Sequence, residues 1–331
     1  MELSIAQHVF SNYFDAAQVI DYSVINNGLI NKTYKLDTSQ GIYILQEINQ
    51  NVFNEPELAL ENIKRVSSWL KEHEFNYAFP TPIHFTYKFF FDKLWRLLPY
   101  INATSYDEIK NKKMVSNATV CIADFYRILD QFPVQDLNIT IPHFHHGQYY
   151  IDEFHKALNH CSLERKTQAT QEINHIKHAL DELAFFDELV RQLPNRVVHF
   201  DTKISNFLFD EDFNVKALID LDTLMPGSIL SDVGDMIRTY SNKLGEESTD
   251  FDRIKADPET VETIVDSILQ HTQLTDLEKN HLFFAGKAIT LMQSIRFLTD
   301  FLKGDVYYAI NHPFHNLNRA KNQFILYDSM N

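Results

Sequence analysis

Cysteine is scarce in this sequence, and the scarcity limits the classes of protein to which the chain can belong. Only Cys121 and Cys161 occur among 331 residues, and the sequence has no C-x-x-C pair. Two isolated cysteines exclude a disulfide framework and fit a reducing compartment. We therefore expect a cytoplasmic protein.

Long apolar runs are also missing. No stretch approaches the roughly 18 consecutive apolar residues of a membrane span, and the first ten residues, MELSIAQHVF, lack a basic region followed by an apolar core. The sequence therefore predicts neither a membrane span nor a signal peptide. It also contains no internal repeats and no low-complexity segments.

Basic residues are too few for a protein that binds nucleic acid. The 30 Lys and Arg are outnumbered by 45 Asp and Glu, which gives a net charge of -15. Because affinity for nucleic acid depends on cations that neutralise phosphates, this balance argues against such a partner. The hydrophobic content of 44% is that of a globular chain with a sizeable core.

Strand and helix patterns divide the chain unevenly. Apolar runs and turn residues predict strands at 22–25, 33–36 and 42–48, a helix at 56–70, and a strand pair at 83–85 and 89–99. Helical periodicity precedes them at 5–19. Beyond residue 100 it dominates, at 106–130, 151–159, 168–193, 258–270, 277–302 and 317–331.

The stretch from 197 to 234 holds two acidic clusters on either side of a predicted hairpin. His199-Phe200-Asp201, with Lys203 and Asn206, precedes the apolar runs 207–209 and 215–219. Asp220-Leu221-Asp222 follows them. Phosphoryl transfer from ATP needs a carboxylate beside the acceptor hydroxyl and oxygen ligands for Mg²⁺. Asp201 is placed for the first task, Asn206 and Asp220 for the second, and Lys203 to offset charge on the γ-phosphate.

Asp and Asn are also ordinary turn formers, and the spacing H-x-D-x-x-x-x-N is weak alone. The combination with the hairpin, the I-D-L-D string and the following S-D-V-G-D string resembles the catalytic loop and metal-binding motif of the protein-kinase-like superfamily. In that superfamily an aspartate of the following helix commonly braces the catalytic loop, a position that Asp235 occupies here.

Two departures from the kinase pattern fall in the N-terminal part. The loop expected to cover the nucleotide spans 27–31, with Asn27 and Gly28 as its predicted contacts. It has a single glycine, which a plain hairpin turn explains as well. Gln46 stands where kinases carry the strand lysine. Either Gln46 contributes hydrogen bonds only, or another cation serves, with Lys32, Lys35 and Arg65 as candidates. Glu61 is placed as the acidic partner on the kinase helix, or it is a solvated helix charge.

The strings HFDTKISNFLFD (199–210) and IDLDTLMPGSILSDVGDMIR (219–238) resemble the aminoglycoside phosphotransferase/choline kinase family, and within it the N-acetylhexosamine 1-kinases. The similarity extends through NGLINKTY (27–34), ILQEINQNVFNEP (44–56), RFLTDFLKGDVYY (296–308) and HNLNRAKNQ (315–323).

The resemblance implies an α+β, two-lobed kinase fold with a nucleotide-binding lobe at 1–99 and a catalytic, substrate-binding lobe at 100–331. It also implies ATP, Mg²⁺ and a small sugar that is phosphorylated at its anomeric hydroxyl. Asp201 would be the base, and Asn206 and Asp220 would be the metal ligands, with Asp222 assisting them. Arg238 and Arg296 would contact the sugar unless they form structural ion pairs.

Other acceptors remain open: choline, homoserine, another sugar or an aminoglycoside. From a different class, a catalytically silent binding protein of the same fold is the further alternative. The complete set of His199, Asp201, Asn206 and Asp220 argues against it. The sequence leaves the oligomeric state open.

Overall fold

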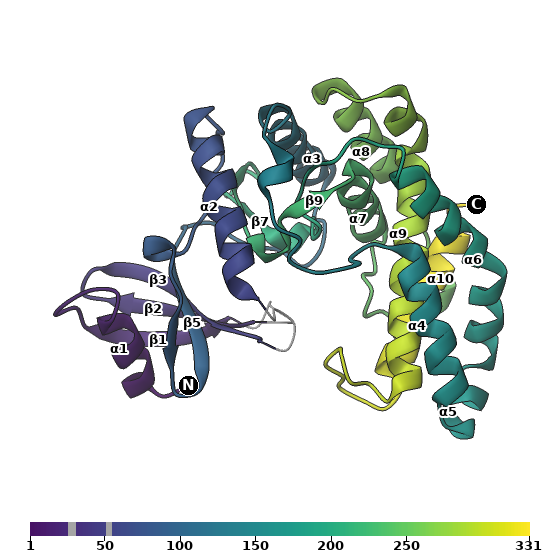
Figure 1. Ribbon diagram of the computed structural model, residues 1–331, viewed down its shortest axis with the longest axis horizontal. Helices are drawn as coiled ribbons and strands as arrows, with labels where there is room; N and C mark the ends of the chain where they lie inside the picture. Colours follow the sequence, from purple (N-terminus) through teal and green to yellow (C-terminus); the bar gives the residue numbers. More distant parts are fainter. Residues whose placement is uncertain (26–30, 51–54) are drawn as a thin grey trace.

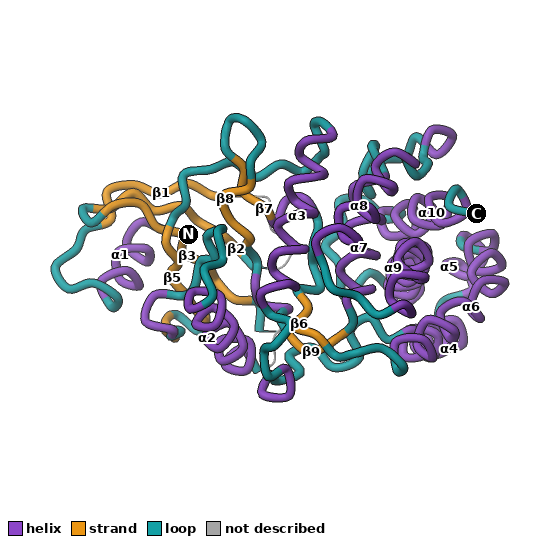
Figure 2. Tube along the Cα trace, turned by 90° about the horizontal axis from the view of Figure 1, so that it is seen from above, coloured by secondary structure: helices purple, strands orange, loops and turns teal. Residues whose placement is uncertain are grey.

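The computed structural model describes residues 1–25, 31–50 and 55–331. Figure 1 shows a small lobe built on a sheet and a larger helical lobe beside it, and Figure 2 shows the same division from above. This architecture confirms the predicted α+β fold with two unequal lobes.

The small lobe is a five-stranded antiparallel sheet with the order β1-β2-β3-β5-β4. Helix α1 (Leu3–Ser11) lies against it, and Ala6, Val9 and Phe10 of the helix join a core with Leu36 and Leu45. Alternate side chains of the strands enter this core, as expected of a sheet with one face covered. The strands are β1 (Val19–Ile25), β2 (Lys32–Thr38), β3 (Gly41–Ile48), β4 (Lys88–Phe90) and β5 (Lys93–Pro99).

Two predictions in the small lobe are wrong. The first helix ends at Ser11 rather than at 19, and the chain reaches β1 through Ala16, whose φ is 58°. The segment Ile83–Phe85 forms a 3-10 turn and no strand, because His84 and Phe85 both have positive φ. Left-handed backbone cannot continue a pleated strand.

Helix α2 (Pro56–Glu72) stands between the sheet and the helices of the large lobe (Figure 1). Its buried face carries Ile63, Val66 and Leu70 at helical spacing, and these side chains belong to the hydrophobic core of the large lobe. Proline at its first position and Glu57 in its first turn favour the start of a helix there.

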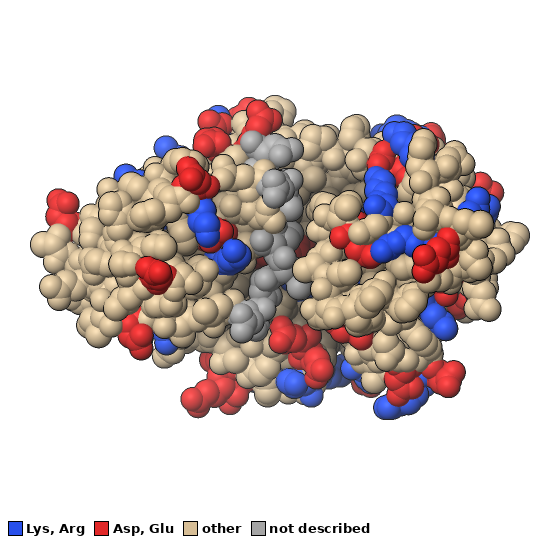
Figure 3. All heavy atoms as spheres, turned by 90° about the horizontal axis from the view of Figure 1, so that it is seen from below, with Lys and Arg blue, Asp and Glu red and all other residues tan. Residues whose placement is uncertain are grey.

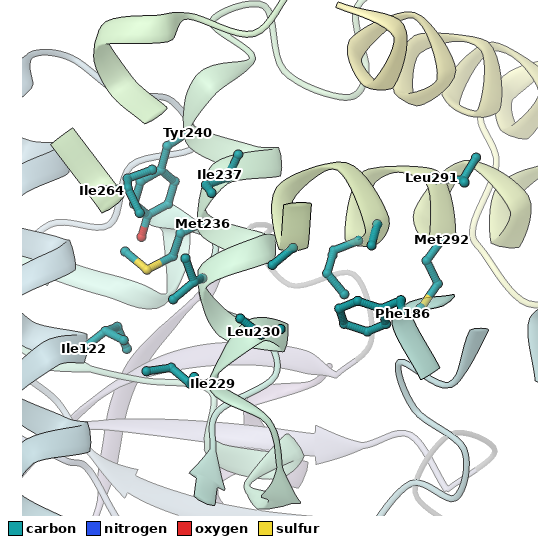
Figure 4. Close-up of a cluster of buried hydrophobic side chains, with 14 of the residues drawn as sticks. Ile122, Phe186, Ile229, Leu230, Met236, Ile237, Tyr240, Ile264, Leu291 and Met292 are labelled. Carbon is teal, nitrogen blue, oxygen red and sulfur yellow. The ribbon is translucent and has the colours of Figure 1, made fainter. Parts of the chain in front are cut away.

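The large lobe surrounds a main hydrophobic core. Figure 4 shows side chains from several helices converging on it, among them Ile122, Phe186, Met236, Tyr240 and Met292. The main helices are α3 (Lys112–Ile128), α4 (Gly147–His160), α5 (Leu163–Gln168), α6 (Thr170–Val190), α7 (Ile229–Ser241), α8 (Pro258–His271), α9 (Asp276–Lys303) and α10 (His315–Asp328).

Helices α7 and α9 cross at two glycines. A Cβ on Gly234 would lie 2.6 Å from the carbonyl oxygen of Ala285, and one on Gly286 would lie 2.3 Å from Ile237. Only residues without a side chain permit this approach. Helix α7 is thereby held rigidly beneath the loop that precedes the hairpin.

Four short strands complete the large lobe: β6 (Arg196–Val198) pairs with β9 (Met225–Gly227), and β7 (Phe207–Phe209) pairs with β8 (Val215–Leu218). The predicted hairpin is therefore confirmed. Within residues 1–25, 31–50 and 55–331, no helix combines the length and apolar character needed to cross a membrane. On the face shown in Figure 3, acidic and basic side chains are interspersed over both lobes.

Candidate functional site

The hairpin β7–β8 brings the two acidic clusters of the sequence together. The loop after β6 carries His199 to Asn206, and Asp220 follows β8 directly. The His199 ring Nε2 lies 3.0 Å from the Ile219 carbonyl oxygen, and the Ile219 N–H donates to the Asn206 carbonyl. These contacts fix the end of the hairpin against its beginning.

Asp232 of α7 fixes this loop by hydrogen bonds to its backbone. Its carboxylate accepts the N–H groups of His199 and Phe200, at 3.0 and 2.7 Å, and the Tyr126 hydroxyl at 2.6 Å. Phe200 has a φ of 66°, a left-handed conformation that these bonds stabilise. Burial raises the pKa of Asp232, although the hydrogen bonds oppose that rise.

The prediction that Asp235 braces the loop is therefore wrong by one turn of α7. Asp235 instead accepts two hydrogen bonds from Arg238, at 2.9 and 3.0 Å. Its second carboxylate oxygen is buried and has no hydrogen-bond partner among the described residues.

Asp201 lies at the centre of the loop. Lys203 Nζ donates to its carboxylate at 2.8 Å, and the side-chain amide of Asn206 donates to its backbone carbonyl at 2.8 Å. Burial raises the pKa of Asp201, but Lys203 outweighs it and holds the pKa below its ordinary value. Asp201 is thus an ionised carboxylate in the folded protein.

Asp220 stands nearby with its side chain open to a cavity. Its φ is 62°, and burial followed by the Asp201 charge raises its pKa to about 6. Because the Asn206 amide nitrogen is bonded to Asp201, its oxygen is the atom left for a cation. Asp220 and Asn206 line the same cavity and are hard oxygen donors, so they fit Mg²⁺, which needs only one or two protein ligands.

The cavity has a volume of about 420 Å³ and lies between the lobes. The end of β5 and the segment after it form one side, with Leu98 and Tyr100. Gln46 of β3 and Ile219 of the hairpin face it from the two lobes. Its size is within the range of about 300–1,000 Å³ typical of small-molecule sites.

The four residues predicted to contact the nucleotide differ in their positions. Asn27 and Gly28 lie outside the described residues. Gln46 lines the cavity, donates to Thr33 at 3.0 Å and accepts from Arg96 at 2.8 Å. Glu61 lies on the exposed face of α2 and accepts from Asn138, so the structure favours a solvated helix charge.

Arg96 of β5 is the important residue that sequence reasoning missed. It is 3% exposed, lines the cavity, and forms a two-pronged ion pair with Asp222, whose Oδ2 lies 2.9 Å from Nη2. Asn31 donates to the same carboxylate at 3.0 Å. Both Asp222 oxygens are therefore occupied, and Asp222 does not line the cavity as predicted for a metal ligand.

The two arginines predicted to contact a sugar have different surroundings. Arg238 is shared between Asp235, Glu246 and Gln323, as the ion-pair alternative requires. Arg296 donates to Gln293 and has no carboxylate partner among the described residues. Its guanidinium lies 5.1–5.8 Å from the ring centres of Phe144, Tyr150 and Tyr308.

His145 lies between these arginines and the loop. Its ring packs 5.4 Å from that of Phe200, and its Nδ1 is buried without a hydrogen-bond partner among the described residues. Burial, with the nearby charges of Arg296 and Arg238, lowers the His145 pKa to about 3. Uncharged His145, Arg296 and the unpartnered oxygen of Asp235 form a polar cluster close to Asp201, as the charge interactions among these groups indicate.

Several solved structures with the same fold are small-molecule phosphotransferases or kinases. An aminoglycoside phosphotransferase from Alicyclobacillus acidocaldarius aligns over 98% of this chain and 94% of its own, with a TM-score of 0.61 and 14% identity. An ethanolamine kinase from Plasmodium vivax aligns over 96% and 85%, with a TM-score of 0.57 and 18% identity. The GDP complex of wild-type aminoglycoside 2'-phosphotransferase-IIIa aligns over 98% and 99%, with a TM-score of 0.63 and 10% identity.

At these identities the similarity establishes the fold. The sequence itself establishes the family, because residues 21–257 match the model of the phosphotransferase enzyme family, and that span includes the cavity, the Asp201 loop and Asp220. The chain belongs to the phosphotransferase enzyme family.

Proposed function

We propose that the protein is an ATP-dependent kinase that transfers the γ-phosphate to the anomeric hydroxyl of an N-acetylhexosamine. The observation that carries the proposal is the ionised carboxylate of Asp201, held by Lys203 and placed beside Asp220 near the cavity between the lobes. A solved relative binds GDP, and another was solved with streptomycin and ATP, which supports a nucleotide in this cavity.

The residues divide the work as follows. Residues 1–99 contribute the sheet over the nucleotide, and residues 100–331 contribute the catalytic loop and the acceptor site. Asp201 orients the acceptor hydroxyl and takes its proton as the oxygen bonds to the γ-phosphorus and the bond to the β-phosphate oxygen breaks. Lys203 offsets the charge of the transferred group. Asn206 and Asp220 would hold Mg²⁺, which neutralises phosphate charge when bound.

The polar cluster near Asp201 supports a sugar as acceptor. Arg296 and His145 offer hydrogen-bond donors, and the open Asp235 oxygen offers an acceptor. The hydroxyl and acetamido groups of an N-acetylhexosamine can form hydrogen bonds with donors and with acceptors alike. A cationic acceptor such as choline would need the aromatic rings of Phe144, Tyr150 and Tyr308, but Arg296 already lies against them. The second candidate is therefore a kinase for another neutral hydroxyl compound, ahead of choline, homoserine or an aminoglycoside.

A coupled assay of ADP release tests the proposal. Mg-ATP is supplied with N-acetylglucosamine, N-acetylgalactosamine, glucose, choline, homoserine or kanamycin, and Asp201→Asn serves as the inactive variant. Turnover confined to the two N-acetylhexosamines, with an acid-labile sugar 1-phosphate as product, is the expected result. Turnover with another acceptor would contradict the sugar assignment, and no turnover with any of the six would contradict the proposal.

A further inference from the structure

The position that carries the phosphate-binding lysine in kinases is filled here by Gln46, which has no charge. Strand β3 pairs with β5 in antiparallel register, and Gln46 lies directly opposite Arg96. Side chains of directly opposite residues emerge on the same face of a sheet. Arg96 therefore projects beside the place that the missing lysine would occupy, and it lines the cavity.

The surrounding residues fix the guanidinium of Arg96 in one orientation. Its Nη1 and Nη2 donate to the two oxygens of Asp222, and its Nε donates to Gln46 at 2.8 Å. A guanidinium carries five N–H groups in a planar fork, so bonds to these two partners do not exhaust it. Asp222 in turn is oriented by Asn31, whose side-chain oxygen accepts the N–H of Asn49.

The other cations considered from the sequence are less well placed. Lys35 also lines the cavity, but its ammonium lies 4.8 Å from the ring centre of Tyr100, in the segment after β5. Lys32 is exposed and paired with Glu47 at 3.5 Å. Arg65 lies on the exposed face of α2.

We propose that Arg96 binds the phosphate groups of the nucleotide in place of the strand lysine, and that Asp222 and Gln46 position it. The proposal rests on the proposed function to the extent that the cavity must bind a nucleotide. In this arrangement the acidic partner of the phosphate-binding cation is Asp222 of the large lobe. The sequence had led us to expect Glu61 of α2 in that role. The ion pair of Arg96 and Asp222 thus joins the lobes at the phosphate end of the cavity.

Calorimetric titration with ADP and with adenosine separates phosphate binding from support of the fold. We expect Arg96→Gln to weaken ADP binding about tenfold or more, because hydrogen bonds to charged groups are lost. Adenosine should bind to the variant within about twofold of its affinity for the wild type, because it lacks the phosphate groups that Arg96 is proposed to bind. The matched control Lys35→Gln should change the affinities for ADP and adenosine by the same factor.

Equal losses for ADP and adenosine in Arg96→Gln would overturn the proposal, as would a loss confined to ADP in Lys35→Gln. If Arg96→Gln does not fold, as judged by circular dichroism, Arg96→Lys takes its place. Lysine keeps the charge but lacks the planar guanidinium fork. We therefore expect a smaller loss of affinity that is still confined to ADP. Equal losses of affinity for ADP and adenosine would overturn the proposal. A wild-type protein that binds neither ligand would refute the proposed function itself.

Discussion

Lys203 Nζ lies 2.8 Å from the carboxylate of Asp201, two residues earlier in the same loop. The ion pair keeps Asp201 ionised against the effect of burial, which alone would raise its pKa. Burial lowers the pKa of Lys203, but Asp201 and Asp220 outweigh it, so the ammonium stays charged. The loop therefore contains the cation that keeps its buried carboxylate ionised.

Replacing Lys203 with Met should raise the pKa of Asp201 and reduce turnover. Without the ammonium, burial and the neighbouring Asp220 favour the protonated carboxyl, which cannot accept a proton. We expect kcat to fall about 10²-fold or more, as for the loss of general-base function, and the acidic limb of the pH–rate profile to move to higher pH. Lys203→Arg keeps the charge and should retain the position of that limb. An unshifted limb in Lys203→Met would contradict this role.

Asp232→Asn should destabilise the fold. The change places an amide NH₂ where a buried carboxylate accepts the N–H groups of His199 and Phe200. Loss of buried partners of this kind costs about 1–3 kcal/mol for each unsatisfied group. Unfolding in urea should show a loss of about 2–4 kcal/mol. Tyr126→Phe removes one donor to the same carboxylate and should cost only about 1 kcal/mol; equal losses would argue against Asp232 as the brace of the loop.

Stability should fall below pH 6.5 partly because of His145. Its pKa is about 3 in the folded protein and 6.5 in the unfolded chain, so between these values the unfolded chain binds a proton that the folded protein does not. Arg296 and Arg238 oppose protonation, while Asp201 favours it. The free energy of unfolding should therefore decrease by up to about 1.4 kcal/mol per pH unit from this group.

The His145→Gln variant lacks this group and should lose stability less steeply between pH 6.5 and 5. Urea unfolding at several pH values gives the slope of the free energy of unfolding against pH for each protein. The two slopes are compared, not the absolute stabilities. His199 is fully buried, and burial lowers its pKa too, so it contributes to the slope in the variant and in the wild type alike. Identical slopes in the variant and the wild type would contradict the expected contribution of His145.

Asp300→Asn should weaken binding of the acceptor and leave the nucleotide unaffected. Asp300 accepts the N–H groups of Val306, Tyr307 and Tyr308 at 2.9–3.0 Å, and it thereby fixes Tyr308 beside Arg296. An amide has one acceptor oxygen in place of two, so this loop should loosen. We expect the KM of the acceptor to rise severalfold, by the loss of about one or two hydrogen bonds.

The KM of ATP should stay the same in that variant. Asp276→Asn is the matched control, because Asp276 lies on the same helix and its side chain is 94% exposed. This variant should change neither KM. Equal increases of both KM values in Asp300→Asn would indicate general damage to the protein.

The helices and strands that could be predicted are those encoded by local patterns. Alternating apolar residues and turns located β2 and β3 to within a few residues, and apolar spacing located α2 and α8. The prediction of a strand at 83–85 was wrong because the two positive φ values there follow from packing, not from residue preference.

The catalytic loop could be found because its residues are close in sequence, whereas residues that meet through tertiary contacts could not. Pairing Gln46 with Arg96 requires the register of β3 against β5, and joining Arg96 to Asp222 requires the arrangement of the lobes. Confusing Asp235 with Asp232 is an error of one helical turn, which periodicity alone does not resolve. A lone arginine inside the apolar run Leu94 to Leu98 was the available signal, since a buried charge needs a partner.

The attachment of α2 to the large lobe affects how the protein unfolds. Its apolar face belongs to the core of that lobe, and its Asn62 side chain donates to the carbonyl oxygens of Leu224 and Asn138 at 2.7 and 2.8 Å. A sheet that melted first would take Arg96 of β5 with it and leave the buried carboxylate of Asp222 without its cation. The two lobes should therefore lose their structure together, in a single cooperative thermal transition.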